Sequence, residues 1–290
     1  EKLTGIFIHD LTIDSVYDYT TDITKVCVTG IELTNVDDSV IYRCKAKNHF
    51  GSVFHVGAKG RGTGQRHDDY LGIKAVMYCI AERCTNEIFS VSCSTKCALI
   101  GNQTKDLVLQ PTGQSPDRRW CHILSIESSR DVLVANNHIF GVPVEEPLTF
   151  TAAVNAVGSQ RIRVINNIFE APSIPEKAAK VNAIYWQLGA GGNHDVDFSY
   201  NYIKNLTCIF RQSEDGSHGR NIKIHGNIIT NGYIYIYQDA ESGWDSTLSA
   251  VDVSGNTIYL PDTDYQPILI RASADPAVSR GDNIKVNSNI

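Results

Sequence analysis

Two short segments in the second half of the chain carry clustered acidic side chains, of which Asp215 and Glu241 occupy equivalent positions. The first reads Arg-Gln-Ser-Glu-Asp over residues 211–215, and the second reads Tyr-Gln-Asp-Ala-Glu over residues 237–241. Glycoside hydrolysis needs two carboxyl groups, about 5–5.5 Å apart for retention and about 6.5–9.5 Å apart for inversion. Crowding raises the pKa of one carboxyl, which suits the group that donates a proton. The candidate catalytic residues are Glu214, Asp215, Asp239 and Glu241.

The side chains around these carboxylates suit a sugar. Aromatic rings stack on sugar faces, and arginine and glutamine side chains bond hydroxyl or acidic groups. Arg211 and Tyr237 would position the sugar beside the acids, and Glu127 is a secondary carboxylate candidate. Further candidate binding residues are Gln187, Tyr185, Tyr235 and Arg271. The less specific alternative is an ordinary exposed sheet edged by polar turns, because Tyr favours strands and acidic residues favour turns.

A short repeat specifies the elements that must position these residues. An apolar–any–apolar triplet is followed, after two residues, by Asn in seven places. The seven are Asn102, Asn137, Asn167, Asn201, Asn227, Asn256 and Asn289. Each later copy also holds a second run of alternating apolar residues, which is typical of a half-buried strand. A unit of roughly 18–35 residues without a helix cannot bury its apolar side alone, so successive units must stack.

Stacked strands predict an all-β fold, a parallel β-solenoid of about ten coils spaced about 4.8 Å apart. Propellers are disfavoured, because they need a fixed period and a signature motif. Upstream the repeat weakens. There, 44–46 and 79–81 are expected to be first strands, and 6–8 and 26–28 suggest two more turns. The second strand of one coil is expected around residues 148–150.

In-register stacking would gather equivalent residues into columns. The Asn side chains are expected to bond one another and to satisfy backbone groups of the turn. Outward residues of the first strands alternate in charge and predict a ladder of solvated ion pairs: Arg163, Asp197, Lys223, Asp252 and Lys285. One outward column of the second strands is expected to read Glu127, Thr151, Gln187, Arg211, Tyr237 and Arg271. Its companion is expected to read Ser125, Thr149, Tyr185, Ile209, Tyr235 and Leu269.

Composition and motifs exclude several classes of function. The net charge of −6 argues against general nucleic-acid binding, which needs a basic surface. No apolar run approaches the about 18 residues of a transmembrane helix, so no membrane insertion is expected. The eight cysteines lack the paired spacing of zinc sites and are expected to be buried thiols. His67-Asp68-Asp69 and His194-Asp195 offer too few ligands for a metal. We therefore expect no cofactor.

The Asn column, the unequal coil lengths and the stacked aliphatic residues resemble the right-handed parallel β-helix proteins. This pectate-lyase-like group includes bacteriophage tailspikes, and the resemblance covers nearly the whole chain. It implies one β-helix domain over residues 1–290, part of a larger protein with its end caps missing. It also implies a polysaccharide-binding groove, a homotrimer, and a place on a virion tail or outside the cell.

The resemblance implies a glycoside hydrolase that acts on a bacterial surface polysaccharide, either capsule or O-antigen. One alternative is a polysaccharide lyase of pectate-lyase type, which uses Arg or Lys as base, here Arg211 or Arg271, and in this family often uses Ca²⁺. Another is a spike that binds glycan without cutting it. A related variant would bind teichoic acid or cleave its phosphodiester bonds.

Overall fold

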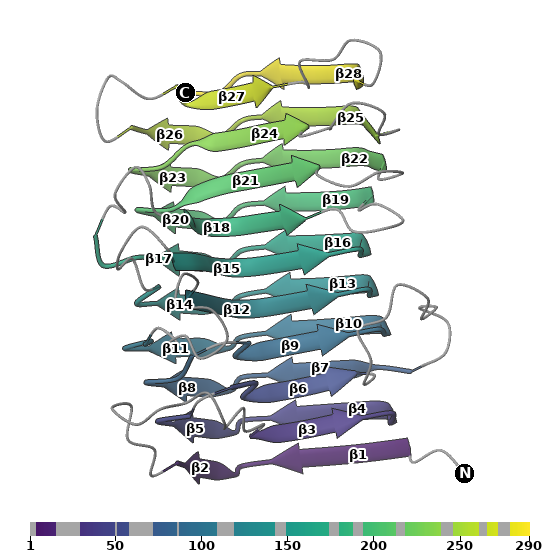
Figure 1. Cartoon of the computed structure of the whole chain (residues 1–290), viewed down its shortest axis with the longest axis vertical. Helices are drawn as coiled ribbons and strands as arrows, with labels where there is room; N and C mark the ends of the chain where they lie inside the picture. Colours follow the sequence, from purple (N-terminus) through teal and green to yellow (C-terminus); the bar gives the residue numbers. More distant parts are fainter. Residues whose placement is uncertain are drawn as a thin grey trace.

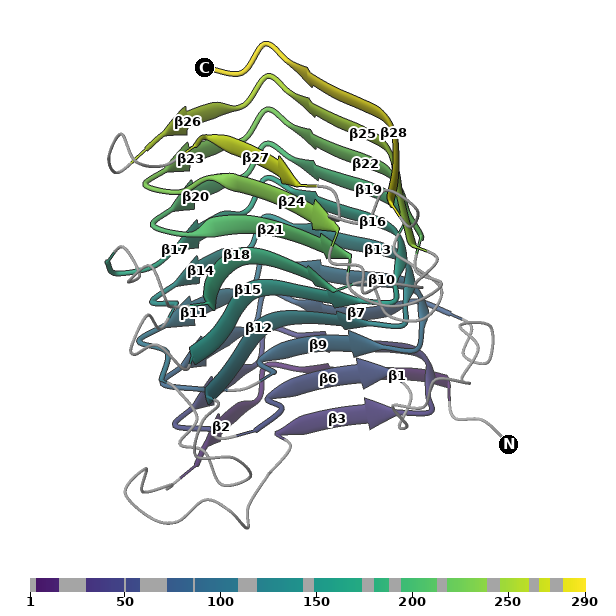
Figure 2. The ribbon, with the colours of Figure 1, turned by 45° about the horizontal axis from the view of Figure 1, so that its top comes forward.

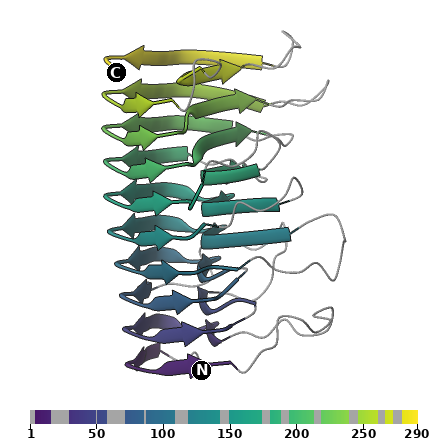
Figure 3. The same cartoon turned by 90° about the vertical axis from the view of Figure 1, so that its left-hand side faces the viewer.

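In the computed structural model, the chain forms a rod of stacked coils. The first and the last described strands lie at opposite ends of this rod (Figures 1 and 3). Every regular element in the described part is a β-strand, and every strand pairing is parallel. The predicted all-β parallel solenoid is therefore confirmed. The structure describes residues 4–15, 30–49, 51–57, 72–85, 87–108, 119–142, 149–173, 180–187, 194–212, 218–238, 246–260, 266–271 and 279–290.

The strands form three parallel sheets, here named A, B and C, and a complete coil adds one strand to each. Sheet A contains β1 (Thr4–His9), β4 (Asp37–Tyr42), β7 (Lys74–Met77), β10 (Thr95–Ile100), β13 (Arg130–Ala135), β16 (Gln160–Ile165), β19 (His194–Ser199), β22 (His218–His225), β25 (Ser246–Ser254) and β28 (Ser279–Asn287). Sheet B contains β2 (Thr12–Asp14), β5 (Lys45–Lys47), β8 (Ile80–Glu82), β11 (Gln103–Lys105), β14 (His138–Phe140), β17 (Ile168–Glu170), β20 (Tyr202–Lys204), β23 (Ile228–Thr230) and β26 (Thr257–Tyr259). Sheet C contains β3 (Ile31–Thr34), β6 (Phe54–Gly57), β9 (Phe89–Ser92), β12 (Arg119–Glu127), β15 (Thr149–Val157), β18 (Lys180–Gln187), β21 (Thr207–Gln212), β24 (Ile234–Gln238) and β27 (Ile268–Arg271).

One apolar core fills the space that the three sheets enclose, and Figure 2 shows sheet C in front of sheet A. Strand alternation sends every second side chain inward. Each inward residue then stacks on its equivalent in the next coil. In sheet A one fully buried column reads Leu99, Val134, Val164, Phe198, Ile224 and Val253. Burial of this continuous column is what a single coil could not achieve.

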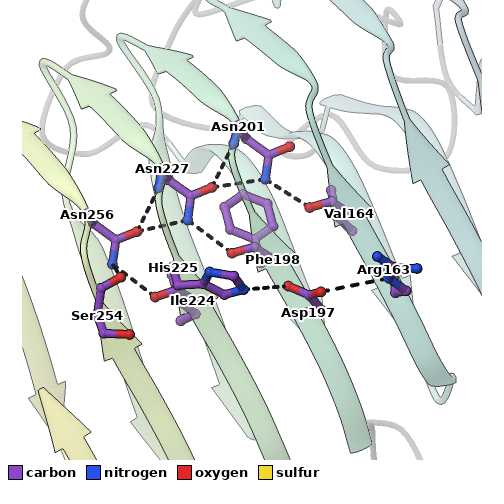
Figure 4. Close-up of polar contacts among 10 residues, drawn as sticks. All are labelled: Arg163, Val164, Asp197, Phe198, Asn201, Ile224, His225, Asn227, Ser254 and Asn256. Atoms are coloured by element: carbon purple, nitrogen blue, oxygen red, sulfur yellow. Dashed lines mark hydrogen bonds and ion pairs between the residues drawn. The ribbon is translucent and has the colours of Figure 1, made fainter. Parts of the chain in front are cut away.

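The predicted Asn ladder is present at the corner between sheets A and B, and Figure 4 shows part of it. The Asn201 side-chain amide donates to Asn227 Oδ1 at 3.0 Å and to the Val164 carbonyl at 2.9 Å. The same pattern links every ladder residue from Asn102 to Asn289. From Asn137 onward each side chain also accepts from the backbone amide of the preceding ladder residue, as Asn227 Oδ1 does from Asn201 at 2.9 Å. The ladder thereby satisfies buried backbone groups that the sharp turn leaves unpaired.

The expected charge column on sheet A is in register from Arg163 to Lys285. Arg163 Nε lies 3.7 Å from Asp197 Oδ2, and His225 Nε2 lies 3.2 Å from Asp197 Oδ1 (Figure 4). These contacts are partly exposed, so they stabilise the rod only modestly.

The structure corrects two assignments upstream. Residues 44–46 and 79–81 fall in or beside β5 and β8 of sheet B, whereas the first strands of those coils are β4 and β7. The sequence pattern missed sheet B because its strands are three residues long and most turn one side chain inward. The expected turn at 6–8 is confirmed as β1, and the one at 26–28 lies outside the described residues.

A third correction concerns β15. Its inward residues are Ala152, Val154 and Ala156, with Val154 beside Ile184, so residues 148–150 do not supply the equivalent positions. Asn155 and Val157 therefore occupy the places expected for Thr149 and Thr151. The error arose because Thr-Phe-Thr alternates more clearly than the small apolar run that follows it.

A search of the described residues finds no helix long and apolar enough to cross a membrane.

Candidate functional site

The outward side of sheet C carries two adjacent columns of side-chain positions, which together we call the C face. The first column reads Glu32, His55, Ser90, Ser125, Asn155, Tyr185, Ile209, Tyr235 and Leu269. The second reads Thr34, Gly57, Ser92, Glu127, Val157, Gln187, Arg211, Tyr237 and Arg271. From β18 to β27 both columns have the predicted register. The C face is therefore a strip of neighbouring side-chain positions that follows the rod.

Two tyrosines of β24 lie side by side in the C-terminal half of the C face. The rings of Tyr235 and Tyr237 are stacked, with centroids 4.5 Å apart and planes inclined by 20°. Both side chains are half-buried, so each ring keeps some surface exposed. Leu269, beside Tyr235 on the next strand, is 36% exposed and continues the apolar surface. Such a surface can stack against the apolar face of a sugar ring.

Four other predicted binding residues occupy backbone positions in the same two columns as the tyrosine pair. Arg211 and Arg271 flank Tyr237 on the adjacent strands, and Gln187 is next to Arg211. Tyr185 is two strands from Tyr235 in its own column. The side chains of these four residues lie outside the described part of the structure. Their contribution to binding stays a prediction that the register supports.

The four candidate catalytic residues, Glu214, Asp215, Asp239 and Glu241, lie outside the described residues. The strand ends that lead to them are described. β21 ends at Gln212, β24 ends at Gln238, and these two residues are paired in register. The two acidic segments thus continue from adjacent strand ends, as their matching positions in the sequence predicted. Their catalytic role stays a prediction.

A polar cluster that the sequence did not reveal occupies the N-terminal half of the C face. His55 Nδ1 lies 2.7 Å from Ser90 Oγ, and His55 Nε2 lies 3.2 Å from Ser92 Oγ. Both serines are buried, whereas the His55 ring is partly exposed. Gly57 makes room for this arrangement, because a Cβ there would come within 2.7 Å of Ser92 Oγ. The imidazole is therefore held at both nitrogens by hydroxyl groups from the neighbouring strand.

The next two strands extend the cluster. Ser125 and Asn155 follow Ser90 in the first column and are buried, and the Ser125 hydroxyl has no hydrogen-bond partner among the described residues. Glu127 follows Ser92 in the second column and is half-buried. The signal in the sequence was a polar residue at each outward position. It was overlooked because an isolated serine in a strand is unremarkable and the contacts depend on stacking.

The metal and thiol predictions have different outcomes. No group of three or more potential metal ligands occurs among the described residues, and His67-Asp68-Asp69 lies outside them. At the other candidate, hydrogen bonds from Asn221 and then from His194 lower the pKa of Asp195. The absence of a cofactor stays a prediction.

The six described cysteines are buried free thiols, as expected: Cys44, Cys79, Cys84, Cys93, Cys97 and Cys208.

Comparison with known proteins identifies the fold. The sequence matches no protein-family model and no curated protein. The surface adhesin PfbA of Streptococcus pneumoniae shares 14% identity at a TM-score of 0.52, over 98% of this chain and 78% of that chain. The endo-xylogalacturonan hydrolase from Aspergillus tubingensis shares 11% at 0.48, over 97% and 93%. The Azotobacter vinelandii mannuronan C-5 epimerase AlgE6 A-module shares 12% at 0.47, over 100% and 75%. At these identities the likeness concerns the fold alone, and the chain is a right-handed parallel β-helix.

Proposed function

We propose that the chain binds a polysaccharide along the C face and hydrolyses its glycosidic bonds. The observation that carries this proposal is the stacked pair Tyr235 and Tyr237, in register with the positions of Arg211 and Arg271. An aromatic platform between cationic positions offers both ring stacking and hydrogen bonds to hydroxyl or acidic groups. Because equivalent positions recur at each coil, the C face suits a chain of sugars lying along the rod.

The spacing of the strands supports hydrolysis as the reaction. β21 and β24 are adjacent parallel strands about 4.8 Å apart, so equivalent side chains on them are separated by about that distance and diagonal pairs by more. Carboxyl groups from the segments after β21 and β24 can therefore span the range that retaining and inverting mechanisms require. In this proposal one protonated carboxyl of Glu214, Asp215, Asp239 or Glu241 donates its proton to the leaving oxygen. A second, ionised carboxylate attacks the anomeric carbon or activates a water molecule for that attack.

The proposed substrate is a bacterial surface polysaccharide, either capsule or O-antigen. The proposed setting is a homotrimeric, tailspike-like appendage on a virion tail or otherwise outside the cell. Binding without cleavage is the second candidate function. It is favoured by one observation: the stacked pair Tyr235 and Tyr237 is a binding feature that needs no catalytic group beside it.

Release of reducing ends from a panel of bacterial polysaccharides tests the reaction, with ultraviolet absorbance of unsaturated uronates read in parallel. We expect new reducing ends without that absorbance. Glu214→Gln, Asp215→Asn, Asp239→Asn and Glu241→Gln are tested singly, and at least two are expected to lose turnover while binding is kept. Glu170→Gln, at a half-buried carboxylate on sheet B, is the matched control. Reducing ends with the absorbance would indicate a lyase, and binding without release would leave the binding function alone.

A further inference from the structure

The His55 cluster has the parts of an activated serine. A neutral imidazole has one N–H group and one bare nitrogen. Among the described contacts Ser90 bonds His55 alone, at 2.7 Å from Nδ1. The simplest proton assignment places the Ser90 hydroxyl proton toward bare Nδ1 and the Nε2–H toward Ser92 Oγ at 3.2 Å. His55 is then a base for Ser90, and Ser92 fixes the tautomer and the ring, which is the arrangement that activates a serine nucleophile.

A second observation points to a ligand at the same place. The Ser125 hydroxyl is fully buried, has no hydrogen-bond partner in the described part of the chain, and follows Ser90 in the first column of the C face. A buried donor without a partner costs free energy, and such groups in native structures call for an explanation. A carbonyl oxygen of a bound acyl group would accept from this hydroxyl. The same bond would strengthen as that oxygen gains negative charge during attack by Ser90.

We propose that Ser90, His55, Ser92 and Ser125 form an esterase site that removes acyl groups from hydroxyls of the bound glycan. The glycan part of this proposal rests on the proposed function. Ser90 Oγ attacks the acyl carbon while its proton moves to His55 Nδ1, and the carbonyl oxygen gains the electron pair beside Ser125. The ester C–O bond then breaks, and the departing sugar hydroxyl takes the proton from His55. Water repeats the sequence on the acyl-serine, releasing a carboxylic acid and restoring Ser90.

Burial of the cluster specifies the size of the acyl group. Ser90 is 2% exposed and Ser92 is 7% exposed, whereas the His55 ring above them is partly exposed. A bulky acyl chain would have to displace the ring to reach Ser90. The site is therefore an acetylesterase, with a strong preference for acetyl over longer acyl esters.

Hydrolysis of p-nitrophenyl acetate by the full chain tests the site without any glycan. We expect an initial burst, and acid-quenched peptide mapping should find the acetyl group on Ser90. Ser90→Ala should abolish the burst and, like His55→Gln, lower the steady rate at least about a hundredfold. The p-nitrophenyl hexanoate ester should react at least about tenfold more slowly than the acetate. Ser254→Ala, at a half-buried serine on sheet A, is the matched control and should change neither rate.

The proposal is overturned if Ser90→Ala keeps the burst, if the acetyl group maps to another residue, or if no acetyl-serine forms. Peptide mapping uses the unaltered protein, so it decides the question even where a variant fails to fold. A separate reducing-end assay on deacetylated polysaccharide reports the glycosidase alone. Loss of one activity with retention of the other therefore shows which proposal has failed.

Discussion

Two rows of polar side chains run along the rod, and they differ in how completely they are hydrogen-bonded. At the corner between sheets A and B, each Asn side chain from Asn102 to Asn256 donates to the next side chain and to a carbonyl of the preceding coil. On the C face the side-chain type changes from strand to strand, and the Ser125 hydroxyl is buried without a partner in the residues that the structure describes. The Asn row repeats one hydrogen-bonding pattern at every coil, whereas the C face has no repeated pattern.

The difference separates structure from function. A repeated, satisfied row stabilises stacking and leaves no group for a ligand. A row of varied side chains with incomplete hydrogen bonding stabilises the stacking of coils less. It presents a different functional group at each coil. In this β-helix the conspicuous sequence signal, the repeated Asn, marks the structural corner. The C face is marked instead by polar and aromatic residues that do not repeat.

The largest effect is expected from breaking the ladder. Asn167→Ala removes the acceptor of the Asn137 backbone amide at 2.9 Å and the donor to the Val134 carbonyl at 3.0 Å. Two buried backbone groups are left unsatisfied, so we expect a loss of about 3–5 kcal/mol in the free energy of unfolding. Urea titration measures it. Asn221→Gly, which loses one exposed bond to Asp195, is the control and should cost under about 1 kcal/mol. Equal losses would contradict a structural role for the ladder.

Cysteines continue the same corner below Asn102, and their reactivity reports its integrity. The Cys79 amide donates to Asn102 Oδ1, and the Cys79 thiol lies 3.8 Å from the Ile41 carbonyl. Burial raises the pKa of Cys79 from 9.0 to about 12. The difference of about three pH units predicts alkylation about a thousandfold slower in the native protein than in urea. Mass spectrometry after iodoacetamide treatment measures the ratio of the two alkylation rates. Similar rates in both states would show that Cys79 is accessible in the native protein and contradict its burial at this corner.

An exposed ion pair on sheet A should contribute far less than the ladder. Arg161 donates to both oxygens of Asp131, at 2.6 and 2.8 Å, and these bonds lower the pKa of Asp131 below 3.8. The pair therefore stabilises the fold above pH 3.8, and that stability is lost as pH falls through the lowered folded value. Both side chains are more than 40% exposed, so the contribution should be below about 1 kcal/mol.

Arg161→Gln checks this prediction. The variant should lose that small increment at pH 6 and match the unaltered protein near pH 2 in urea titrations. Lys285→Gln, which removes one positive charge from the exposed end of sheet A, is the control. An equal effect of Arg161→Gln at both pH values would contradict the assignment to Asp131.

The smallest loss of stability is expected from one member of a matched pair of buried serines, Ser129 and Ser125. Ser129 Oγ donates to the Glu127 carbonyl at 2.9 Å and lies in a short serine row with Ser94 and Ser159. Ser129→Ala should therefore cost about 1–2 kcal/mol. Ser125→Ala removes a buried hydroxyl that has no partner among the described residues and therefore costs free energy, so this variant should be at least as stable as the unaltered protein. If Ser125→Ala were the more costly variant, the contrast between satisfied and incomplete rows would fail.

Sequence periodicity predicted the fold and the C-terminal half of the C face because their residues repeat. Asn167 and its equivalents fix the register of each coil. The column that runs from Gln187 through Arg211 and Tyr237 to Arg271 follows from that register. Asn155 was missed because the small residues around Val154 give a weak alternation. His55 and Ser90 were missed for another reason. They are 35 residues apart, each is ordinary in a strand, and only stacking brings their side chains to 2.7 Å.

Glycan binding by two tyrosine variants tests most directly whether the C face is the functional face. Tyr237→Ala removes one ring of the stacked pair on β24, and Tyr202→Ala removes a half-buried tyrosine from β20 on sheet B. Calorimetric titration with a polysaccharide that the unaltered protein binds is the measurement. We expect Tyr237→Ala to weaken binding about tenfold, equivalent to about 1.4 kcal/mol, and Tyr202→Ala to leave it within about twofold. Equal affinities for the two variants, or a larger loss for Tyr202→Ala, would contradict the assignment of glycan binding to the C face.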